Sequence, residues 1–240
     1  MARLLQACLN GSRSRDEHPA VPHTPEELAA EARAAVDAGA RVLHLHPYDS
    51  SGVETLAAEP CADALRAVRA ACPGVPISLS TSAEIEADPE RRLALVAAWT
   101  ELPELVTANQ DEAGIVELCE HLLERGVGIE AGLLEVEGAR RFAAAGIAGR
   151  CTRLLVEPLG DEPEAALADA AQIEQLVAQA GIELEQVHHG DGAATWHVMS
   201  RGLERGHGIR VGLEDTTVLP DGSRPEGNGD LVRAAAALLP

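Results

Sequence analysis

Short apolar runs alternate along the chain with longer segments rich in Ala, Leu, Glu and Arg. The short runs have the length of buried β-strands, and the longer segments repeat apolar residues with helical period. Repeated β-α units of this kind form a parallel sheet. Eight units without a long linker favour a closed (β/α)8 TIM barrel over an open sheet, and residues 1–240 are expected to form one domain.

The boundaries of the expected elements follow from turn and cap residues. Thr24, Pro25 and Glu27 provide an N-cap hydroxyl, a proline at the first helical position and a capping-box carboxylate, so a helix should begin at Pro25. The expected strands are Leu4–Leu9, Arg41–His46, Val75–Thr81, Leu105–Asn109, Val127–Gly132, Arg153–Glu157, Leu184–His189 and Ile209–Glu214. The expected helices are approximately Pro25–Ala38, Pro60–Ala71, Pro89–Thr100, Asp111–Arg125, Glu135–Ala145, Glu162–Ala180, Ala193–Glu204 and Glu226–Leu239.

Composition narrows the classes of partner. The formal net charge is -20, from 39 acidic and 19 basic residues, which argues against a nucleic-acid partner because phosphate backbones require a basic surface. The five cysteines are scattered and lack Cys-x-x-Cys spacing, which is typical of reduced thiols in the cytoplasm. No apolar run approaches 18 residues and no secretion signal is visible, so we expect a cytoplasmic protein without a membrane span.

The second expected strand carries two histidines of the same parity. His44 and His46 point to one face because side chains alternate along a strand, and two imidazoles this close can share a zinc ion. Glu214 ends the eighth strand, which in a closed barrel lies one strand away, so it is a candidate third ligand. Three ligands leave an open position, as in catalytic zinc sites. The structural alternatives are polar residues at a strand end and an ion pair between Glu214 and Arg210.

Other polar side chains gather at the same strand ends, and Asp215 directly follows Glu214. Asp215 is a candidate acid or base and Arg210 a cation beside it, and the short donors that could hold a substrate carboxylate are Asn10, Ser80 and Thr107. Strands six and seven are less clear, with Glu157, His188 and His189 as candidates. Active sites of TIM barrels lie at the C-terminal ends of the strands, where these residues fall.

Several segments together resemble the β-keto acid cleavage enzymes, a zinc-dependent (β/α)8 family typified by 3-keto-5-aminohexanoate cleavage enzyme. The matching pieces are Asn10-Gly11, HPAVPHTPEELAAEA, AGARVLHLHPYD, Ser80-Thr81, VTAN and GHGIRVGLED. The resemblance implies zinc held by His44, His46 and Glu214, with Asp215 as general base and Arg210 orienting it. It also implies that Ser80 and Thr107 contact a β-keto acid, which exchanges carbon units with acetyl-CoA to give acetoacetate and a new CoA thioester.

Departures from the family pattern concern the substrate rather than the fold. Ser82 and Ala83 stand where the family usually has two glycines, Arg13 stands where an acidic residue is common, and the loop after Thr107 is short. The alternatives are therefore a zinc-dependent hydrolase or isomerase on the same barrel, or a catalytically silent metal-binding relative. The presence of Arg210, Glu214 and Asp215 together argues against the silent relative. Exposed Ala/Leu helix faces lead us to expect a homo-oligomer.

Overall fold

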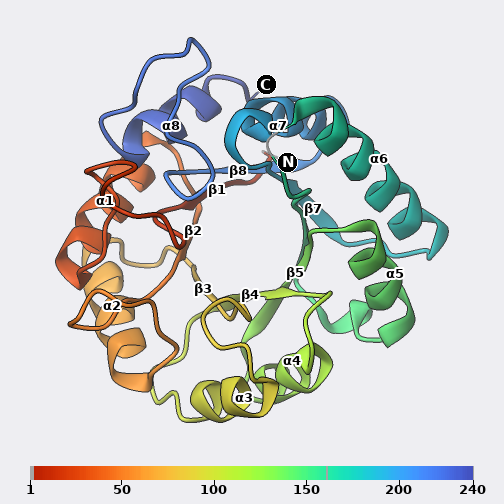
Figure 1. Cartoon of the computed structure of the whole chain (residues 1–240), viewed down its shortest axis with the longest axis horizontal. Coiled ribbons are helices and arrows are strands. Elements are labelled where there is room, and N and C mark those ends of the chain that lie inside the picture. Colours follow the sequence, from red (N-terminus) through yellow and green to blue (C-terminus); the bar gives the residue numbers. More distant parts are fainter. Residues whose placement is uncertain (1–2, 161, 240) are drawn as a thin grey trace.

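The computed structural model describes residues 3–160 and 162–239. Eight parallel strands close into a barrel in chain order, because β1 pairs with both β2 and β8, and the helices surround it (Figure 1). The strands are β1 (Leu5–Cys8), β2 (Val42–Leu45), β3 (Ile77–Ser80), β4 (Leu105–Asn109), β5 (Gly128–Leu133), β6 (Arg153–Val156), β7 (Glu185–His188) and β8 (Gly208–Val211). The expected TIM barrel is thus confirmed.

Eight α-helices and two short 3-10 helices are present in the described ranges. They are α1 (Pro25–Ala38), α2 (Ala58–Ala71), α3 (Pro89–Ala97), α4 (Ile115–Glu124), α5 (Val136–Ala145), η1 (Ala148–Arg150), α6 (Pro163–Gln179), η2 (Gly192–Ala194), α7 (Thr195–Glu204) and α8 (Asn228–Ala236). Helix α1 begins where its capping box predicted: the Thr24 hydroxyl accepts from the Glu27 amide at 3.2 Å, and the Glu27 carboxylate accepts from the Thr24 amide at 3.0 Å.

The expected end of the eighth strand at Glu214 is wrong. Strand β8 ends at Val211, and residues 212–215 form a turn in which the Leu213 amide donates to Asn228 Oδ1 at 2.8 Å. Gly212 permits this turn, since a Cβ there would lie 1.8 Å from the Cys8 carbonyl oxygen. Helix α4 likewise begins at Ile115 rather than Asp111, after a short turn. Such boundaries depend on contacts between elements and not on apolar period alone.

A continuous apolar layer lies between the strands and the helices. Outward-facing strand residues such as Leu43, Leu79 and Val211 are fully buried in it. Polar residues fill part of the barrel interior instead: Gln6 Nε2 donates to Glu130 Oε2 at 3.1 Å, and both side chains have no exposed surface. No helix among the described residues is both long and apolar enough to cross a membrane.

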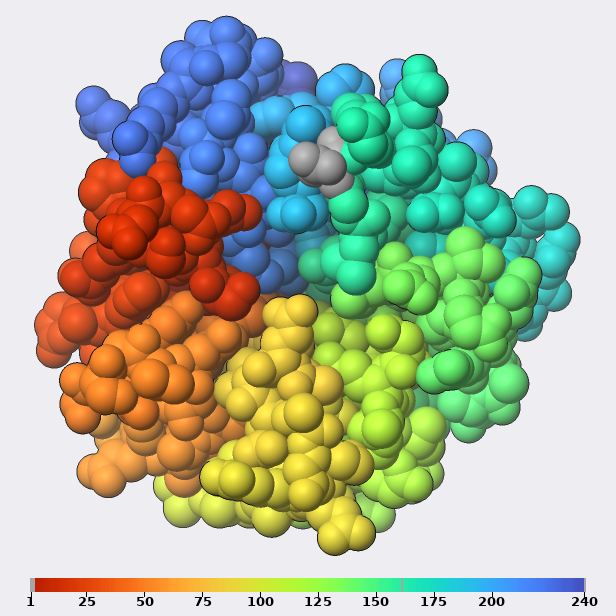
Figure 2. Space-filling view, in the orientation of Figure 1, coloured from red at the N-terminus to blue at the C-terminus, as the bar shows by residue number. Residues whose placement is uncertain are grey.

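The loops that follow the strands converge over the barrel axis. In the space-filling view, the loop after β1 (red) and the loop after β3 (yellow) meet near the centre (Figure 2). Beneath them lies a cavity of about 510 Å³. Its walls include His44, His46, Ser80, Thr107 and Arg210, so the fold brings side chains from four strands and their ends to one place.

Candidate metal centre and active site

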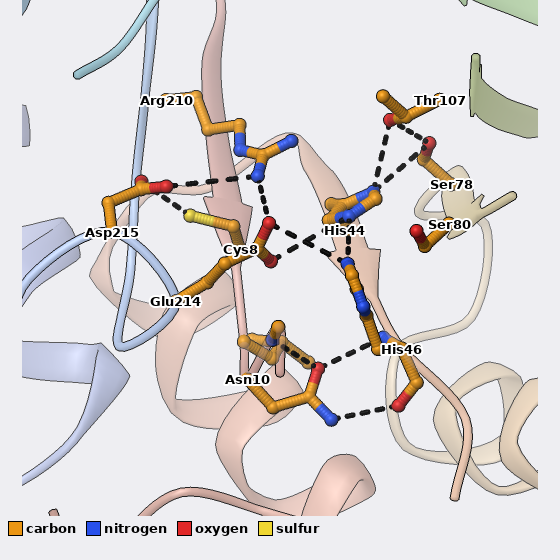
Figure 3. Close-up of polar contacts among 12 residues, drawn as sticks. Cys8, Asn10, His44, His46, Ser78, Ser80, Thr107, Arg210, Glu214 and Asp215 are labelled. Carbon is orange, nitrogen blue, oxygen red and sulfur yellow. Dashed lines mark hydrogen bonds and ion pairs between the residues drawn. The ribbon is translucent and has the colours of Figure 1, made fainter. Parts of the chain in front are cut away.

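Three potential metal ligands converge on one wall of this cavity. The Nε2 atoms of His44 and His46 lie 3.1 Å apart, and the two rings are nearly perpendicular at 81°. Glu214 comes from the turn after β8 and places Oε2 3.7 Å from His44 Nε2 and Oε1 3.6 Å from His46 Nε2 (Figure 3). The expected neighbourhood of the three side chains is thus present, although Glu214 reaches it from a turn.

The spacing of the three donors fits a small divalent cation. Zinc binds nitrogen and carboxylate oxygen at about 2.0–2.2 Å, which places the ligands of a tetrahedral site about 3.3–3.6 Å apart. The two nitrogens lie 3.1 Å apart, and each lies 3.6–3.7 Å from one of the two Glu214 oxygens, which is close to this range. Glu214 Oε2 is also buried with no hydrogen-bond partner in the described part of the chain. The donor set therefore suits a metal with an open position toward the cavity.

The ion pair that was the structural alternative for Glu214 is present as well. Arg210 Nη2 donates to Glu214 Oε1 and lies 3.7 Å from Asp215 Oδ1. Its Nε and Nη1 are buried without hydrogen-bond partners among the described residues. Arg210 is only 1% exposed, but it lines the cavity. An anionic group in the cavity could therefore accept hydrogen bonds from Nε and Nη1.

Glycine is required where the first loop passes Glu214. Gly11 has φ +57°, and a Cβ at this position would lie 2.4 Å from Glu214 Cγ. Glycine is the amino acid that allows both this left-handed backbone and such a close approach. The missing side chain at Gly11 thus leaves the space that Glu214 occupies.

Asn10 and Thr107 have partners other than a substrate. The Asn10 amide donates to the His46 carbonyl at 2.8 Å and accepts from the His46 amide at 2.9 Å, and it also contacts Pro22 and Gly11. Thr107 Oγ1 lies 3.2 Å from His44 Nδ1. Both predicted substrate contacts therefore stay predictions, whereas the observed contacts orient the two histidines.

Ser80 remains available to a ligand. It lines the cavity, and its hydroxyl accepts a hydrogen bond from the Ser82 amide at 3.3 Å, which leaves its own hydrogen free to donate. The predicted role of Ser80 in binding is therefore compatible with its position.

Asp215 is buried, with 4% of its surface exposed. The Cys8 thiol donates to Asp215 Oδ2 at 2.7 Å, and His189 Nδ1 lies 3.4 Å from Asp215 Oδ1. His189 Nε2 lies 3.1 Å from Glu157 Oε2, and Glu157 lines the cavity. His189 thus joins Asp215 to a carboxylate on the cavity wall.

The charges of these groups are strongly coupled. Burial lowers the pKa of His46, but the carboxylates of Glu214 and Glu54 outweigh it and raise the pKa to about 9. Burial holds the pKa of His44 well below its usual value. Burial alone would raise the pKa of Glu214, yet Arg210 and both histidines hold it well below its usual range. Glu214 is therefore an anion suited to a cation.

Two residues of this region were missed by reasoning from the sequence. Glu54 accepts a hydrogen bond from His46 Nδ1, and no spacing rule links a residue in that loop to the strand before it. Cys8 shares the inward parity of Gln6 and Asn10, so the alternation of β1 was a usable signal. The sequence predicts Glu157 and His189 as inward candidates but assigns them no role.

The profile of the family described as beta-keto acid cleavage enzyme matches residues 4–240. The chain belongs to this family. Family membership makes it an enzyme that acts on carbon–carbon bonds and on a small-molecule substrate. The expected family resemblance is confirmed over nearly the whole chain.

Two curated relatives, both named 3-keto-5-aminohexanoate cleavage enzyme, show how distant this family member is. The protein from Fusobacterium nucleatum subsp. nucleatum is 27% identical over 253 residues, covering 98% of this chain and 90% of the relative. The protein from Acetoanaerobium sticklandii is 25% identical over 249 residues, with the same coverage.

A solved structure shares the fold. ObcA, in a ternary complex with a C4-CoA adduct and oxalate, superposes with a TM-score of 0.76 at 16% identity. The match covers 91% of this chain and 63% of ObcA, so the chain spans less than two thirds of the ObcA length.

Proposed function

We propose that this chain is a zinc-dependent β-keto acid cleavage enzyme that exchanges carbon units between a β-keto acid and acetyl-CoA, giving acetoacetate and a CoA thioester. The observation that carries the proposal is the convergence of His44, His46 and Glu214 beside a cavity, at separations suited to one divalent ion. The two relatives named for cleavage of 3-keto-5-aminohexanoate support the substrate class.

The chain's own residues account for substrate binding. The unpartnered Nε and Nη1 of Arg210 would bind the substrate carboxylate, and the Ser80 hydroxyl would donate a further hydrogen bond. Zinc bound by the three ligands would polarise the β-carbonyl and stabilise negative charge on its oxygen. The chain contains no lysine, so an imine between a lysine amine and the ketone is excluded as an alternative way of activating the carbonyl.

We assign the general base to Asp215, which would take a proton from the substrate carbon while Arg210 orients its carboxylate. The support is the 3.7 Å approach of Arg210 Nη2 to Asp215 Oδ1. Glu157 is the second candidate, because it lines the cavity and lies 3.1 Å from His189, whose other ring nitrogen lies 3.4 Å from Asp215. Asp215→Asn and Glu157→Gln distinguish the two candidates. The variant that lacks the true base should lose about 10²–10⁴-fold in turnover and keep the metal.

The charge of the cavity bears on the second substrate. Seven of its lining side chains are acidic (Glu17, Glu84, Asp111, Glu112, Glu157, Asp191 and Glu214), whereas Arg13 and Arg210 are the two arginines. Arg13 is already engaged by Glu17 at 2.8 Å and by the Glu214 carbonyl at 2.8 Å. This balance favours a substrate with a cationic group and disfavours the phosphates of coenzyme A. Hydrolysis, with water as acyl acceptor, is therefore the second candidate function.

One set of experiments tests the proposal. Protein expressed in zinc-replete medium should contain about one equivalent of zinc by elemental analysis, and His44→Ala with His46→Ala should lose it while the fold persists. A panel of β-keto acids, with and without acetyl-CoA, should show cleavage that requires acetyl-CoA and yields acetoacetate. Cleavage without acetyl-CoA would establish the hydrolase instead, and protein with neither zinc nor cleavage would refute both.

Glu214→Gln separates the ligand from the base. An amide is a poor zinc ligand, so this variant should lose both metal and turnover, whereas Asp215→Asn should lose turnover alone. Arg210→Lys should fall between them, because an ammonium keeps the charge but not the two-pronged geometry of a guanidinium. An Asp215→Asn enzyme with wild-type turnover would show that the base is assigned wrongly.

We also propose a cytoplasmic location and a homo-oligomer. All five cysteines are buried and unpaired, as in reducing compartments. Val53, Leu159 and Val218 are large apolar side chains that are 44–60% exposed, and contact with another copy would cover them. A monomeric mass by light scattering at micromolar concentration would refute the oligomer.

A further inference from the structure

We propose that Glu54 is a positioning residue for the metal site: it fixes the ring orientation and the tautomer of His46, so that the Nε2 lone pair faces the ion. The inference rests on the metal site of the proposed function, but not on any substrate or on acetyl-CoA. It concerns a contact across the loop that follows β2.

The loop between residues 48 and 54 folds back, so that Glu54 lies next to the end of β2. Tyr48 and Glu54 form an antiparallel bridge, and the Asp49 amide donates to the Val53 carbonyl at 2.8 Å. Asp49 Oδ1 accepts from the amides of Ser51 and Val53 at 2.8 and 3.1 Å. The loop is thus a closed turn with its own hydrogen bonds.

The contacts of this loop also tie it to the site. The Tyr48 hydroxyl donates to the Gly11 carbonyl at 2.8 Å, and the Thr55 amide donates to the Pro47 carbonyl at 2.9 Å. With both ends held, the Glu54 carboxylate contacts His46 Nδ1, and the two side chains are only 15% and 11% exposed. Such a shielded contact holds a geometry that an exposed ion pair does not.

A carboxylate partner determines which nitrogen of His46 carries hydrogen. An ionised carboxylate can only accept, so Nδ1 must donate, and when a metal displaces the hydrogen from Nε2 that nitrogen presents its lone pair to the ion. His44 differs, because its Nδ1 lies 3.2 Å from Thr107 Oγ1 and 3.4 Å from Ser78 Oγ, and hydroxyls can donate or accept. Of the two histidines, His46 is therefore the one whose tautomer is imposed by a charged neighbour.

Two variants separate the geometry from the charge. Glu54→Ala removes the acceptor, and loss of a partner of this kind typically weakens metal binding about 10–100-fold. Glu54→Gln keeps an oxygen that can accept from Nδ1 and should recover part of the affinity. Glu59→Ala is the matched control, because it removes an exposed acid of α2 only five residues away.

The measurement is zinc affinity, determined by competition with a chromophoric chelator after the purified full-length protein has been stripped of metal. Circular dichroism of each metal-free variant establishes that it is folded. The expected order is wild type and Glu59→Ala tightest, Glu54→Gln intermediate and Glu54→Ala weakest. In long-range ¹H–¹⁵N spectra of the zinc-loaded protein, the His46 ring should carry its hydrogen on Nδ1, and this signal should change in Glu54→Ala.

The outcomes distinguish this inference from the proposed function. Equal zinc affinity of Glu54→Ala and wild type would overturn the role of Glu54 and leave the metal site standing. Wild-type protein that binds no zinc would overturn the metal site, and with it the proposed function. An equal loss in Glu59→Ala would show that net charge, rather than contact with His46, controls affinity.

Discussion

Gly11→Ala should damage the metal site far more than it damages the fold. A residue other than glycine at φ +57° costs about 1–2 kcal/mol of backbone strain. The new methyl would lie 2.4 Å from Glu214 Cγ, whereas carbon atoms normally pack about 3.5–4.0 Å apart. Glu214 must therefore move by roughly 1 Å, which exceeds the tolerance of about 0.2 Å for a metal–ligand distance. We expect zinc affinity to fall at least about tenfold.

Gly181→Ala is the matched control for this prediction. Gly181 has φ +67° just after α6, and a Cβ there would meet no atom within 4 Å. In denaturant titrations of the metal-free protein both variants should show the backbone strain of about 1–2 kcal/mol, and in chelator competition only Gly11→Ala should lose zinc affinity. Wild-type zinc affinity in folded Gly11→Ala would refute the claim that Gly11 sets the position of Glu214.

Two further predictions concern stability. Burial, together with His207 and nearby arginines, lowers the pKa of His188 to about 3, so the unfolded chain, with a usual value near 6.5, takes up the proton first as the pH falls. Between pH 7.5 and 5.5 the wild type should lose roughly 1 kcal/mol more of its unfolding free energy than His188→Phe does. Parallel pH dependences of wild type and His188→Phe would contradict the assignment. Glu112→Ala should cost about 3–5 kcal/mol in denaturant unfolding, because it leaves the buried guanidinium of Arg92, 2.8 Å away, without its carboxylate. Glu124→Ala, at an exposed position, should cost little. Similar losses in the two variants would count against a buried ion pair.

Local periodicity was sufficient to predict the barrel and two of the three candidate metal ligands. Apolar runs of strand length and helices of period 3.6 are properties of neighbouring residues, so the eight β-α units could be read in order. The same alternation predicted that His44 and His46 share a face, because both lie within or directly after one strand. The capping box predicted the start of α1 to the residue.

Barrel closure decided the contacts between residues far apart in the chain. Glu214 reaches the histidines from a turn that Gly212 and Asn228 shape, and Asp215 is turned toward Cys8, 207 positions earlier. Asn10 and Thr107 were expected to face a substrate, yet their nearest partners are the histidines. Side-chain hydrogen bonds form wherever burial removes water, and which groups are buried together is a property of the closed barrel and not of any single strand.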